Sequence, residues 1–318
     1  MRTIEAKERP LSVTLNNLTV RYGSLKAVDN LTALFPPGST GLLGPNGAGK
    51  SSLIKALLSL VPAAAGSAEI FGKDVVAEKK AIRQIVGYMP EDDCLIPGLT
   101  GIGMVQYAGE LCGMNRGDAM QRAHEVLFMT GLEEARYRKV ESYSSGMKQR
   151  IKLAQAIVHD PKLLFLDEPT SGMDPKGRQE MLDLIRTIAS GGTMSIIVAT
   201  HILIDVERTC ERAVVMHRGR IVKQENMENL QGSYAGTFSV RVEGDRSAFE
   251  TFLVKRGCKI TPDGQHLFDV TLPKDSDTAL ILKAAQKEDV LLRRLVPSVQ
   301  SLEDVFVKLI KEDSHADL

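Results

Sequence analysis

The segment from Gly44 to Ser51 restricts the fold of this chain more than any other part of the sequence. It reads GPNGAGKS and fits the pattern G-x-x-x-x-G-K-[ST] at every defined position. A short apolar run at 40–43 precedes it, and residues 51–60 follow with good helix formers and one apolar face. Glycines let the backbone curl so that successive N–H groups point inward, and the helix adds its positive dipole end. This order of strand, turn and helix predicts a cradle for the phosphates of a nucleotide.

Two side chains of this segment have predicted roles in nucleotide chemistry. Lys50 places a compact cation against the β- and γ-phosphates, and Ser51 offers a hydroxyl to Mg²⁺. We therefore expect a nucleoside triphosphate and Mg²⁺ as ligands, with Lys50 as a candidate catalytic residue. The residues expected to contact the nucleotide here are Gly44, Pro45, Asn46, Gly47, Ala48, Gly49, Lys50, Ser51 and Ser52.

A second apolar run, at 162–167, ends in two adjacent acids, Asp167 and Glu168. A buried strand would bring both acids to the edge of a sheet, which is where ligands bind in open α/β sheets. Asp167 would hold Mg²⁺ through a water molecule. Glu168 points the other way and could act as the general base for an attacking water. Together with the phosphate cradle, these acids indicate a hydrolytic site.

The strand and helix signals predict an α/β layer architecture. The continuous apolar runs at 162–167 and 195–200 are typical of a buried parallel sheet, with a helix at 176–189 between them. Strand signals vanish where helices are predicted at 101–113 and 117–130, so we place a helical insert at about 95–142. Further strands are predicted at 12–20, at 27–35, at 66–90 as short strands with turns near Gly72 and Gly87, and at 213–216 and 220–222 as a hairpin.

A polar stretch with two glycines, 225–236, predicts a domain boundary. We assign residues 11–226 to a first domain and residues 236–318 to a smaller accessory domain. In the second domain we expect strands at 237–243, 258–260, 266–272 and 290–295, and helices at 246–256, 276–287 and 301–311. This βαββαβ-like order resembles a ferredoxin-like α+β domain.

The composition argues against several classes of protein. The chain has 40 Lys and Arg residues and 40 Asp and Glu residues, so no broad field attracts nucleic acid. Hydrophobic residues make up 43% of the 318 residues, which is enough for a full core and argues against global disorder. Four scattered cysteines without a Cys-x-x-Cys pair indicate neither a zinc site nor a disulfide framework. There is no apolar run of about 20 residues and no signal core, so we expect a cytoplasmic protein.

The segment 143–150, YSSGMKQR, resembles the signature sequence of ATP-binding-cassette (ABC) ATPases, usually written LSGGQ. Ser144 and Gly146 keep the serine and the second glycine, whereas the other three positions differ. This variant is similar to the one in the ABC-2-type branch of drug, antibiotic and polysaccharide exporters. The resemblance implies a P-loop NTPase with a RecA-like core and an antiparallel β subdomain. It also implies that Ser144, as a helix cap, and Gly146 contact the γ-phosphate of an ATP held by the opposite subunit.

The resemblance assigns roles to further residues. Tyr22 matches the aromatic residue that stacks on adenine. His201 matches the switch histidine, which bonds the γ-phosphate and orients Glu168, so His201 joins the candidate catalytic residues. Glu91 stands where many family members have Gln, and either side chain offers an oxygen to Mg²⁺. Residues 171–174 match a loop that crosses the dimer interface.

The resemblance spans residues 12–225 and implies the ATP-hydrolysing subunit of an ABC transporter, an exporter. Such a chain works as a homodimer or heterodimer on the cytoplasmic face of the membrane, beneath a separate integral membrane permease. Residues 91–112 would then line the groove that takes a helix of this permease. The segment 297–306, PSVQSLEDVF, resembles the ending of the extra domain found in the same branch.

An alternative from another functional class stays open. A soluble ATPase of the ABC superfamily that remodels a macromolecular complex would carry the same nucleotide motifs. Such chains usually hold two cassettes in tandem, whereas this chain has one set of motifs. Copurification with a multispan membrane protein would separate the two functions.

Overall fold

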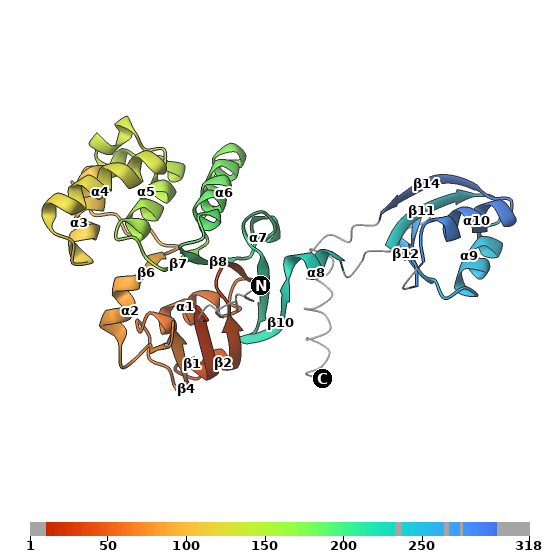
Figure 1. Ribbon diagram of the computed structural model, residues 1–318, viewed down its shortest axis with the longest axis horizontal. Helices are drawn as coiled ribbons and strands as arrows, with labels where there is room; N and C mark the ends of the chain where they lie inside the picture. The colour runs from red at the N-terminus through yellow and green to blue at the C-terminus, as the bar shows by residue number, and fades with distance from the viewer. Residues whose placement is uncertain (1–10, 233–236, 264–266, 274–275, 298–318) are drawn as a thin grey trace, which may run out of the picture. The chain divides into compact units, whose positions relative to one another are not determined.

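The computed structural model describes residues 11–232, 237–263, 267–273 and 276–297 (Figure 1). The chain divides into two compact units, of which the first ends at Asn226 and the second begins at Met227. The helix predicted at 301–311 lies outside the described residues.

A six-stranded sheet forms the centre of the first unit, with the order β10-β9-β3-β8-β7-β6. Its strands are β3 (Ser39–Leu43), β6 (Val86–Met89), β7 (Leu163–Asp167), β8 (Ser195–Thr200), β9 (Arg212–His217) and β10 (Arg220–Asn226). All neighbours pair in parallel except β9 and β10, which form the predicted hairpin. Every residue of β3, β7 and β8 is buried, which explains the apolar runs of the two later strands.

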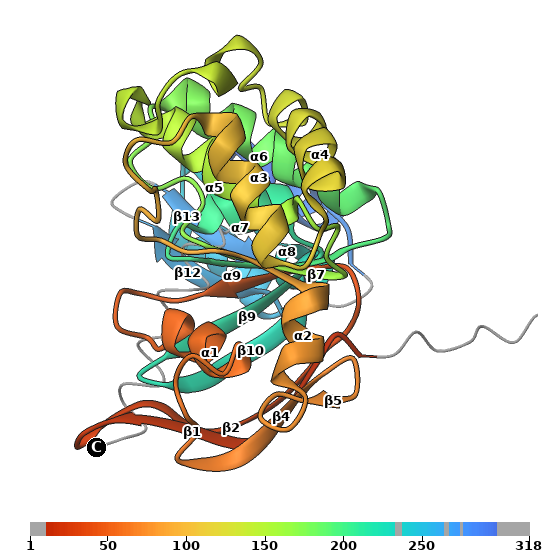
Figure 2. The same cartoon turned by 90° about the vertical axis from the view of Figure 1, so that its left-hand side faces the viewer.

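A second, antiparallel sheet of the first unit has the order β2-β1-β4-β5. Its strands are β1 (Val13–Tyr22), β2 (Leu25–Phe35), β4 (Ala65–Ile70) and β5 (Lys73–Asp74). Helix α1 (Lys50–Leu57) contacts β1, β2 and β4 on one side and β8 of the central sheet on the other. Leu53, Ile54 and Leu57 of α1 are buried in the core cluster shared by both sheets. Figure 2 shows α1 between the two sheets.

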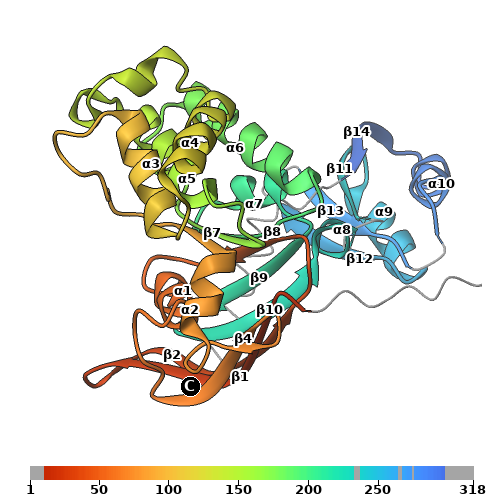
Figure 3. The same ribbon diagram turned by 60° about the vertical axis from the view of Figure 1, so that its left-hand side comes forward.

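The predicted helical insert consists of α3 (Gly101–Leu111), α4 (Arg116–Met129) and two short 3-10 helices, Glu134–Tyr137 and Val140–Ser142. It leads into α5 (Ser145–Ile157). The starts of α3 and α4 are fixed by side-chain caps, because Thr100 accepts from the N–H of Gly103 and Asn115 from the N–H of Asp118. Figures 2 and 3 show these helices at the end of the first unit opposite β1, β2 and β4.

Three local expectations were wrong or incomplete. Helix α2 (Lys79–Ile85) occupies part of the region predicted as short strands, and α7 (Leu203–Thr209) was not predicted. Both have only seven residues, which is too short for a clear helical period. Gly87 lies inside β6 and not in a turn. A Cβ at Gly87 would stand 2.1 Å from the carbonyl oxygen of Ala156, so glycine here permits close packing against α5.

Helix α6 (Pro175–Ser190) lies between β7 and β8, as predicted, and has 16 residues. Asp174 caps its start by accepting from the N–H of Gly177 at 3.3 Å. Within the ranges that the structure describes, no helix combines the length and apolar character needed to cross a membrane.

The second unit has the predicted strand and helix order. After the short helix α8 (Met227–Gly232) come β11 (Thr237–Glu243), α9 (Arg246–Val254), β12 (Lys259–Asp263), β13 (Leu267–Thr271), α10 (Ala279–Lys287) and β14 (Leu291–Pro297). The four strands pair antiparallel in the order β12-β13-β11-β14, which is a ferredoxin-like arrangement. Phe249 of α9 and Phe268 of β13 meet edge to face in its core, with ring centroids 6.1 Å apart.

Candidate nucleotide-binding site

Four parallel strands of the central sheet end at one edge, and each is followed by a residue singled out in the sequence. The glycine-rich segment from Gly44 follows β3, and Glu91 follows β6. Asp167 and Glu168 stand at the end of β7, and His201 follows β8. The pairings β6–β7, β7–β8 and β8–β3 are parallel, so these strand ends point the same way. The sheet thus gathers the segment and the acids at its carboxyl edge, the usual ligand position in α/β folds.

The glycines of the segment are required by its close packing and its backbone angles. Gly47 and Gly49 have φ values of 79° and 103°, which side chains other than glycine rarely adopt. A Cβ at Gly49 would stand 2.2 Å from the carbonyl oxygen of Ala27, and one at Gly44 would stand 2.4 Å from that of Met216. The loop can therefore lie flat against the neighbouring strands and leave its outer side open before the start of α1.

Lys50 is held inside the curve of the loop and is only 6% exposed. Its Nζ donates to the carbonyl oxygens of Gly44 at 2.7 Å and Pro45 at 3.3 Å, and it lies 3.8 Å from Oε1 of Glu168. Burial lowers the pKa of Lys50, and the negative charges of Glu168 and Asp167 oppose this shift. The ammonium group is thus placed between the loop and the acids, where a phosphate would require a cation.

The donor set around Asp167 fits a hard cation such as Mg²⁺. Ser51 Oγ donates to Oδ1 of Asp167 at 3.1 Å, and Glu91 lines the same pocket as Ser51. Burial raises the pKa of Asp167, and the hydrogen bond from Ser51 opposes this shift. Among the described residues, no three His, Cys, Asp or Glu side chains are grouped to hold a metal. Few protein oxygens, supplemented by phosphate and water, are the usual surroundings of Mg²⁺ at a nucleotide.

The carboxylate of Glu168 is fixed by three donors from the end of β8. Thr200 Oγ1 donates to Oε2 at 3.0 Å, and the backbone N–H of His201 donates to Oε1 at 3.0 Å. Nδ1 of His201 lies 2.8 Å from the same Oε1. The Glu168 side chain is 6% exposed, whereas that of His201 is 48% exposed. The acid is therefore locked in one orientation while the imidazole reaches toward the open side of the sheet edge.

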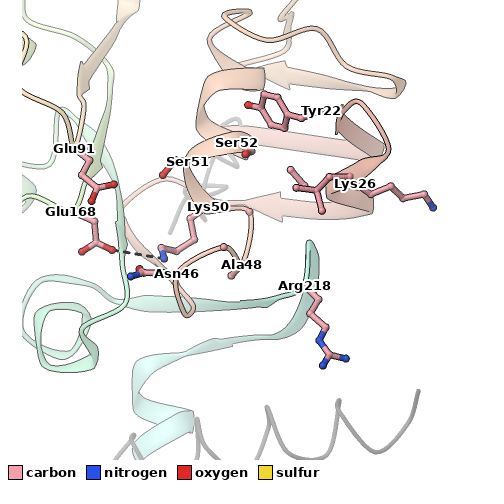
Figure 4. Close-up of a pocket in the computed structure, with 14 residues that line it drawn as sticks. Tyr22, Lys26, Asn46, Ala48, Lys50, Ser51, Ser52, Glu91, Glu168 and Arg218 are labelled. Carbon is pink, nitrogen blue, oxygen red and sulfur yellow. Dashed lines mark ion pairs between the residues drawn. The ribbon is translucent and has the colours of Figure 1, made fainter. Parts of the chain in front are cut away.

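A pocket with a volume of about 600 Å³ covers the outer side of the loop. It is lined by Tyr22, Leu25, Lys26, Ala27, Asn46, Gly47, Ala48, Gly49, Lys50, Ser51, Ser52, Glu91, Glu168 and Arg218. Figure 4 shows Tyr22 on the far side of the pocket from Glu91 and Glu168, with the loop between them. The aromatic ring at one end and the acids at the other fit the base and the phosphates of a nucleotide that lies along the loop.

Ser144 and Gly146 do not line this pocket. Ser144 caps α5 by accepting from the N–H of Met147 at 3.4 Å, and its side chain is exposed. The start of α5 therefore presents a helix N-terminus to the outside of the chain. A single copy of the protein does not bring these two predicted residues to its own pocket.

The chain matches known proteins over most of its length. Residues 28–171 match the family described as ABC transporter. An uncharacterized ABC transporter ATP-binding protein of Bacillus subtilis (strain 168), YxlF, is 31% identical over 306 residues, covering 94% of this chain and 99% of that protein. This chain belongs to the ABC transporter ATP-binding proteins. This ABC protein is an ATPase subunit, which binds and hydrolyses ATP.

Two further matches bear on branch and assembly. The daunorubicin resistance ATP-binding protein DrrA3 of Streptomyces coeruleorubidus is 32% identical over 311 residues, covering 95% of this ABC protein and 96% of that one. The dimeric structure of MJ0796, a bacterial ABC transporter cassette, matches with a TM-score of 0.63 at 25% identity. This match covers 68% of the present chain and 98% of the MJ0796 chain.

Several residues that support the ABC site were missed in the sequence. Thr200 was passed over, although it adjoins His201 and bonds Glu168. Tyr88 of β6 was also missed; burial, with the charge of Asp167, raises its pKa, so its hydroxyl stays protonated beside that carboxylate. Their only sequence signal is a position at or near a strand end that carries a site residue.

Asp205 of α7 was missed as well and is fully buried. It accepts from Thr170 Oγ1 at 2.6 Å and from Nε and Nη2 of Arg178 at 2.9 and 2.6 Å. This network ties the loop after Glu168 to the helix that follows His201. A buried carboxylate with such partners is expected to fix the relative positions of these two segments.

Replacing Tyr22 by Ala should weaken ATP binding without loss of the fold. If Tyr22 stacks on the adenine, removing the ring should raise the dissociation constant for ATP about tenfold. Tyr22→Phe keeps the ring and should bind ATP like the unchanged protein. Equilibrium titration with a fluorescent ATP analogue measures the affinity of the two variants and of the unchanged protein. Tyr107→Ala is the matched control, because Tyr107 is 44% exposed against 45% for Tyr22 and lies outside the pocket. Equal affinity for Tyr22→Ala and the control would contradict an adenine-stacking role.

Proposed function

We propose that two copies of the cassette, identical or closely related, close head to tail around two ATP molecules. The observation that carries this proposal is the position of the start of α5. Ser144 caps this helix on the exposed surface, and neither it nor Gly146 reaches the chain's own pocket. A helix N-terminus with open N–H groups attracts anions. The γ-phosphate of an ATP bound to a second copy is an anion of suitable charge, and the matched MJ0796 cassette is itself dimeric.

Within each site, different residues of the protein bind the nucleotide, neutralise charge and accept a proton. Tyr22 stacks on the adenine, and the backbone of 44–52 binds the phosphates. Lys50 neutralises charge that develops on the transferred phosphoryl group. Glu168, held by Thr200 and His201, takes the proton of the attacking water. His201 reaches from Glu168 toward the γ-phosphate.

The metal site we propose consists of Ser51, Glu91 and Asp167. Mg²⁺ bound there would supply positive charge to the β- and γ-phosphates. Ser51 offers its hydroxyl, and Asp167, bonded to it at 3.1 Å, would act through a water. Glu91 brings one more negative charge to this cluster than the Gln of many family members. We therefore expect this site to bind a divalent cation more tightly than a site with Gln at this position would.

The cycle of dimer closure and reopening would drive export through a separate integral membrane permease. The chain resembles the ABC-2-type exporter branch in its signature. A relative that is 32% identical, in an alignment covering 95% of this chain, is named for daunorubicin resistance. A drug-like or antibiotic-like molecule is thus the substrate class that we assign to the complete transporter. The protein would lie on the cytoplasmic face of the cell membrane, held there by the permease, and no nucleic acid would take part.

Recovery of the full chain with a multispan membrane protein tests the transporter assignment. A tagged chain expressed in its native host should bring down one such protein from detergent-solubilised membranes, and the pair should hydrolyse ATP in vesicles. Leu111 is 69% exposed at the end of α3, within the segment 91–112 expected to line the permease groove. Leu111→Asp should lower recovery about tenfold, because it places a charge where the permease would bury an apolar side chain.

The matched control for this experiment is Leu60→Asp, since Leu60 is 56% exposed and lies after α1. This variant should copurify like the unchanged chain. Recovery of the chain with a soluble macromolecular complex and with no multispan protein would instead support the remodelling ATPase.

A further inference from the structure

Lys152 of α5 is a buried cation outside the nucleotide pocket, 1% exposed. Its Nζ donates to three consecutive backbone carbonyls, those of Pro90 at 2.9 Å, Glu91 at 2.7 Å and Asp92 at 3.4 Å. An ammonium group has three N–H donors, so this set of acceptors can satisfy all of them. A buried cation would be strongly unfavourable without such partners. The side chain is therefore fixed to the loop that follows β6.

These three hydrogen bonds connect the loop after β6 directly to helix α5. The loop carries Glu91, whose side chain lines the nucleotide pocket. Helix α5 begins at the cap Ser144, which does not line that pocket, and the helix contacts β6. Lys152 lies two turns into α5, and its side-chain bonds to backbone carbonyls connect this helix to the loop that carries Glu91. The position of Glu91 then depends on where α5 lies.

A second contact between α5 and the loop is weaker. Lys148, one turn before Lys152, forms an ion pair with Asp93 at 2.8 Å. The two side chains are 34% and 52% exposed, so water screens the pair and its effect on the loop is small. Burial lowers the pKa of Lys152, and the nearby Cys94, followed by Asp93, Asp92 and Glu91, opposes that shift. Lys148 thus offers a matched control with the same charge, on the same helix face.

We propose that Lys152 is a positioning residue that fixes residues 90–92 to α5 and thereby sets the place of the Glu91 carboxylate at the metal and nucleotide. This proposal rests on the function proposed above. In that function the start of α5 binds the second ATP of the dimer. Lys152 then carries a displacement of α5 into the neighbouring site, so closure at one nucleotide adjusts the acid at the other.

The test compares Lys152→Met with Lys148→Met in the full-length chain. Methionine has a similar length and no hydrogen-bond donor, so Lys152→Met removes the three bonds with little change in volume. Hydrogen–deuterium exchange of amides 91–95, without nucleotide, should become about tenfold faster in Lys152→Met, because the loop opens more often. It should stay within about twofold of the unchanged protein in Lys148→Met.

The effect should also appear in the Mg²⁺ dependence of ATP hydrolysis. In Lys152→Met the Mg²⁺ concentration for half-maximal activity should rise about tenfold, whereas the ATP affinity measured in EDTA should stay unchanged. In a Glu91→Ala background, adding Lys152→Met should shift the Mg²⁺ dependence less than about twofold, because the lysine acts through Glu91. A general loss of folding would move all of these quantities together. If Lys152→Met does not fold, Lys152→Gln, which keeps a donor, replaces it.

The possible outcomes separate this proposal from the function on which it rests. Unchanged exchange at 91–95 would overturn the proposal that Lys152 fixes this loop to α5. Faster exchange with the same Mg²⁺ dependence, or a full shift that persists in Glu91→Ala, would overturn the link to Glu91. If the unchanged protein shows no Mg²⁺-dependent hydrolysis, the proposed function fails, and the exchange measurement still decides whether Lys152 holds the loop.

Discussion

Replacing Glu168 by Gln will stop ATP hydrolysis and leave ATP binding intact. The carboxylate is locked by Thr200 Oγ1 and the backbone N–H of His201, each at 3.0 Å. Glutamine has nearly the same shape but cannot take the proton of the attacking water. The turnover number should fall by about 10³-fold, within the usual contribution of a general base. Steady-state release of phosphate, measured with saturating Mg·ATP, checks the prediction.

The same variant should accumulate as an ATP-bound dimer, because in the proposed cycle hydrolysis is the step that reopens the dimer. Light scattering after gel filtration in Mg·ATP should give twice the monomer mass for Glu168→Gln. Glu133→Gln is the control, since Glu133 is an exposed acid of the helical insert and should keep full activity. A Glu168→Gln protein that remains monomeric, or that turns over ATP at the unchanged rate, would contradict the role assigned to this acid.

Lys50→Ala and Ser144→Arg should each abolish turnover, for different reasons. Lys50→Ala removes a cation that lies 3.8 Å from Glu168 inside the glycine-rich loop, so ATP would lose the direct partner proposed for its phosphates. Ser144→Arg removes the cap of α5 and, in the proposed dimer, places a long side chain where the second copy's ATP would approach. Each loss should exceed about 10²-fold in turnover, comparable with the removal of one stabilising donor from a reacting site. Lys55→Ala, one turn further along α1, is the control and should retain turnover.

The fold of the first unit could be predicted because its strands are buried on both faces. The apolar runs at 162–167 and 195–200 became β7 and β8, in which every residue is buried. The glycine-rich segment fixed the path from β3 to α1, because Gly44 and Gly49 have backbone atoms of other strands within 2.4 Å of a hypothetical Cβ. The alternation of strands and helices from 237 to 297 similarly predicted the ferredoxin-like order.

The supporting residues of the site could not be predicted, because they depend on contacts between distant segments. Lys152 lies 60 or more positions from the loop that it holds, and nothing in the surrounding helical pattern marks it as buried. Asp205 looks like an ordinary acid of a short helix until Arg178 and Thr170 are brought beside it. Gly87 likewise suggests a turn in the sequence, and only the packing of β6 against α5 explains it.

Mixing the Lys50→Ala and Ser144→Arg chains, and measuring ATP hydrolysis across their ratios, tests most directly whether each ATP lies between two copies. In a mixed dimer both lesions fall in one site, and the other site has intact residues from both chains. With random pairing about half of the dimers are mixed at an equal ratio, so activity should recover to about a quarter of the unchanged level. Shared sites predict this maximum near the equal ratio. No recovery at any ratio, with cross-linking showing that mixed dimers form, would contradict them.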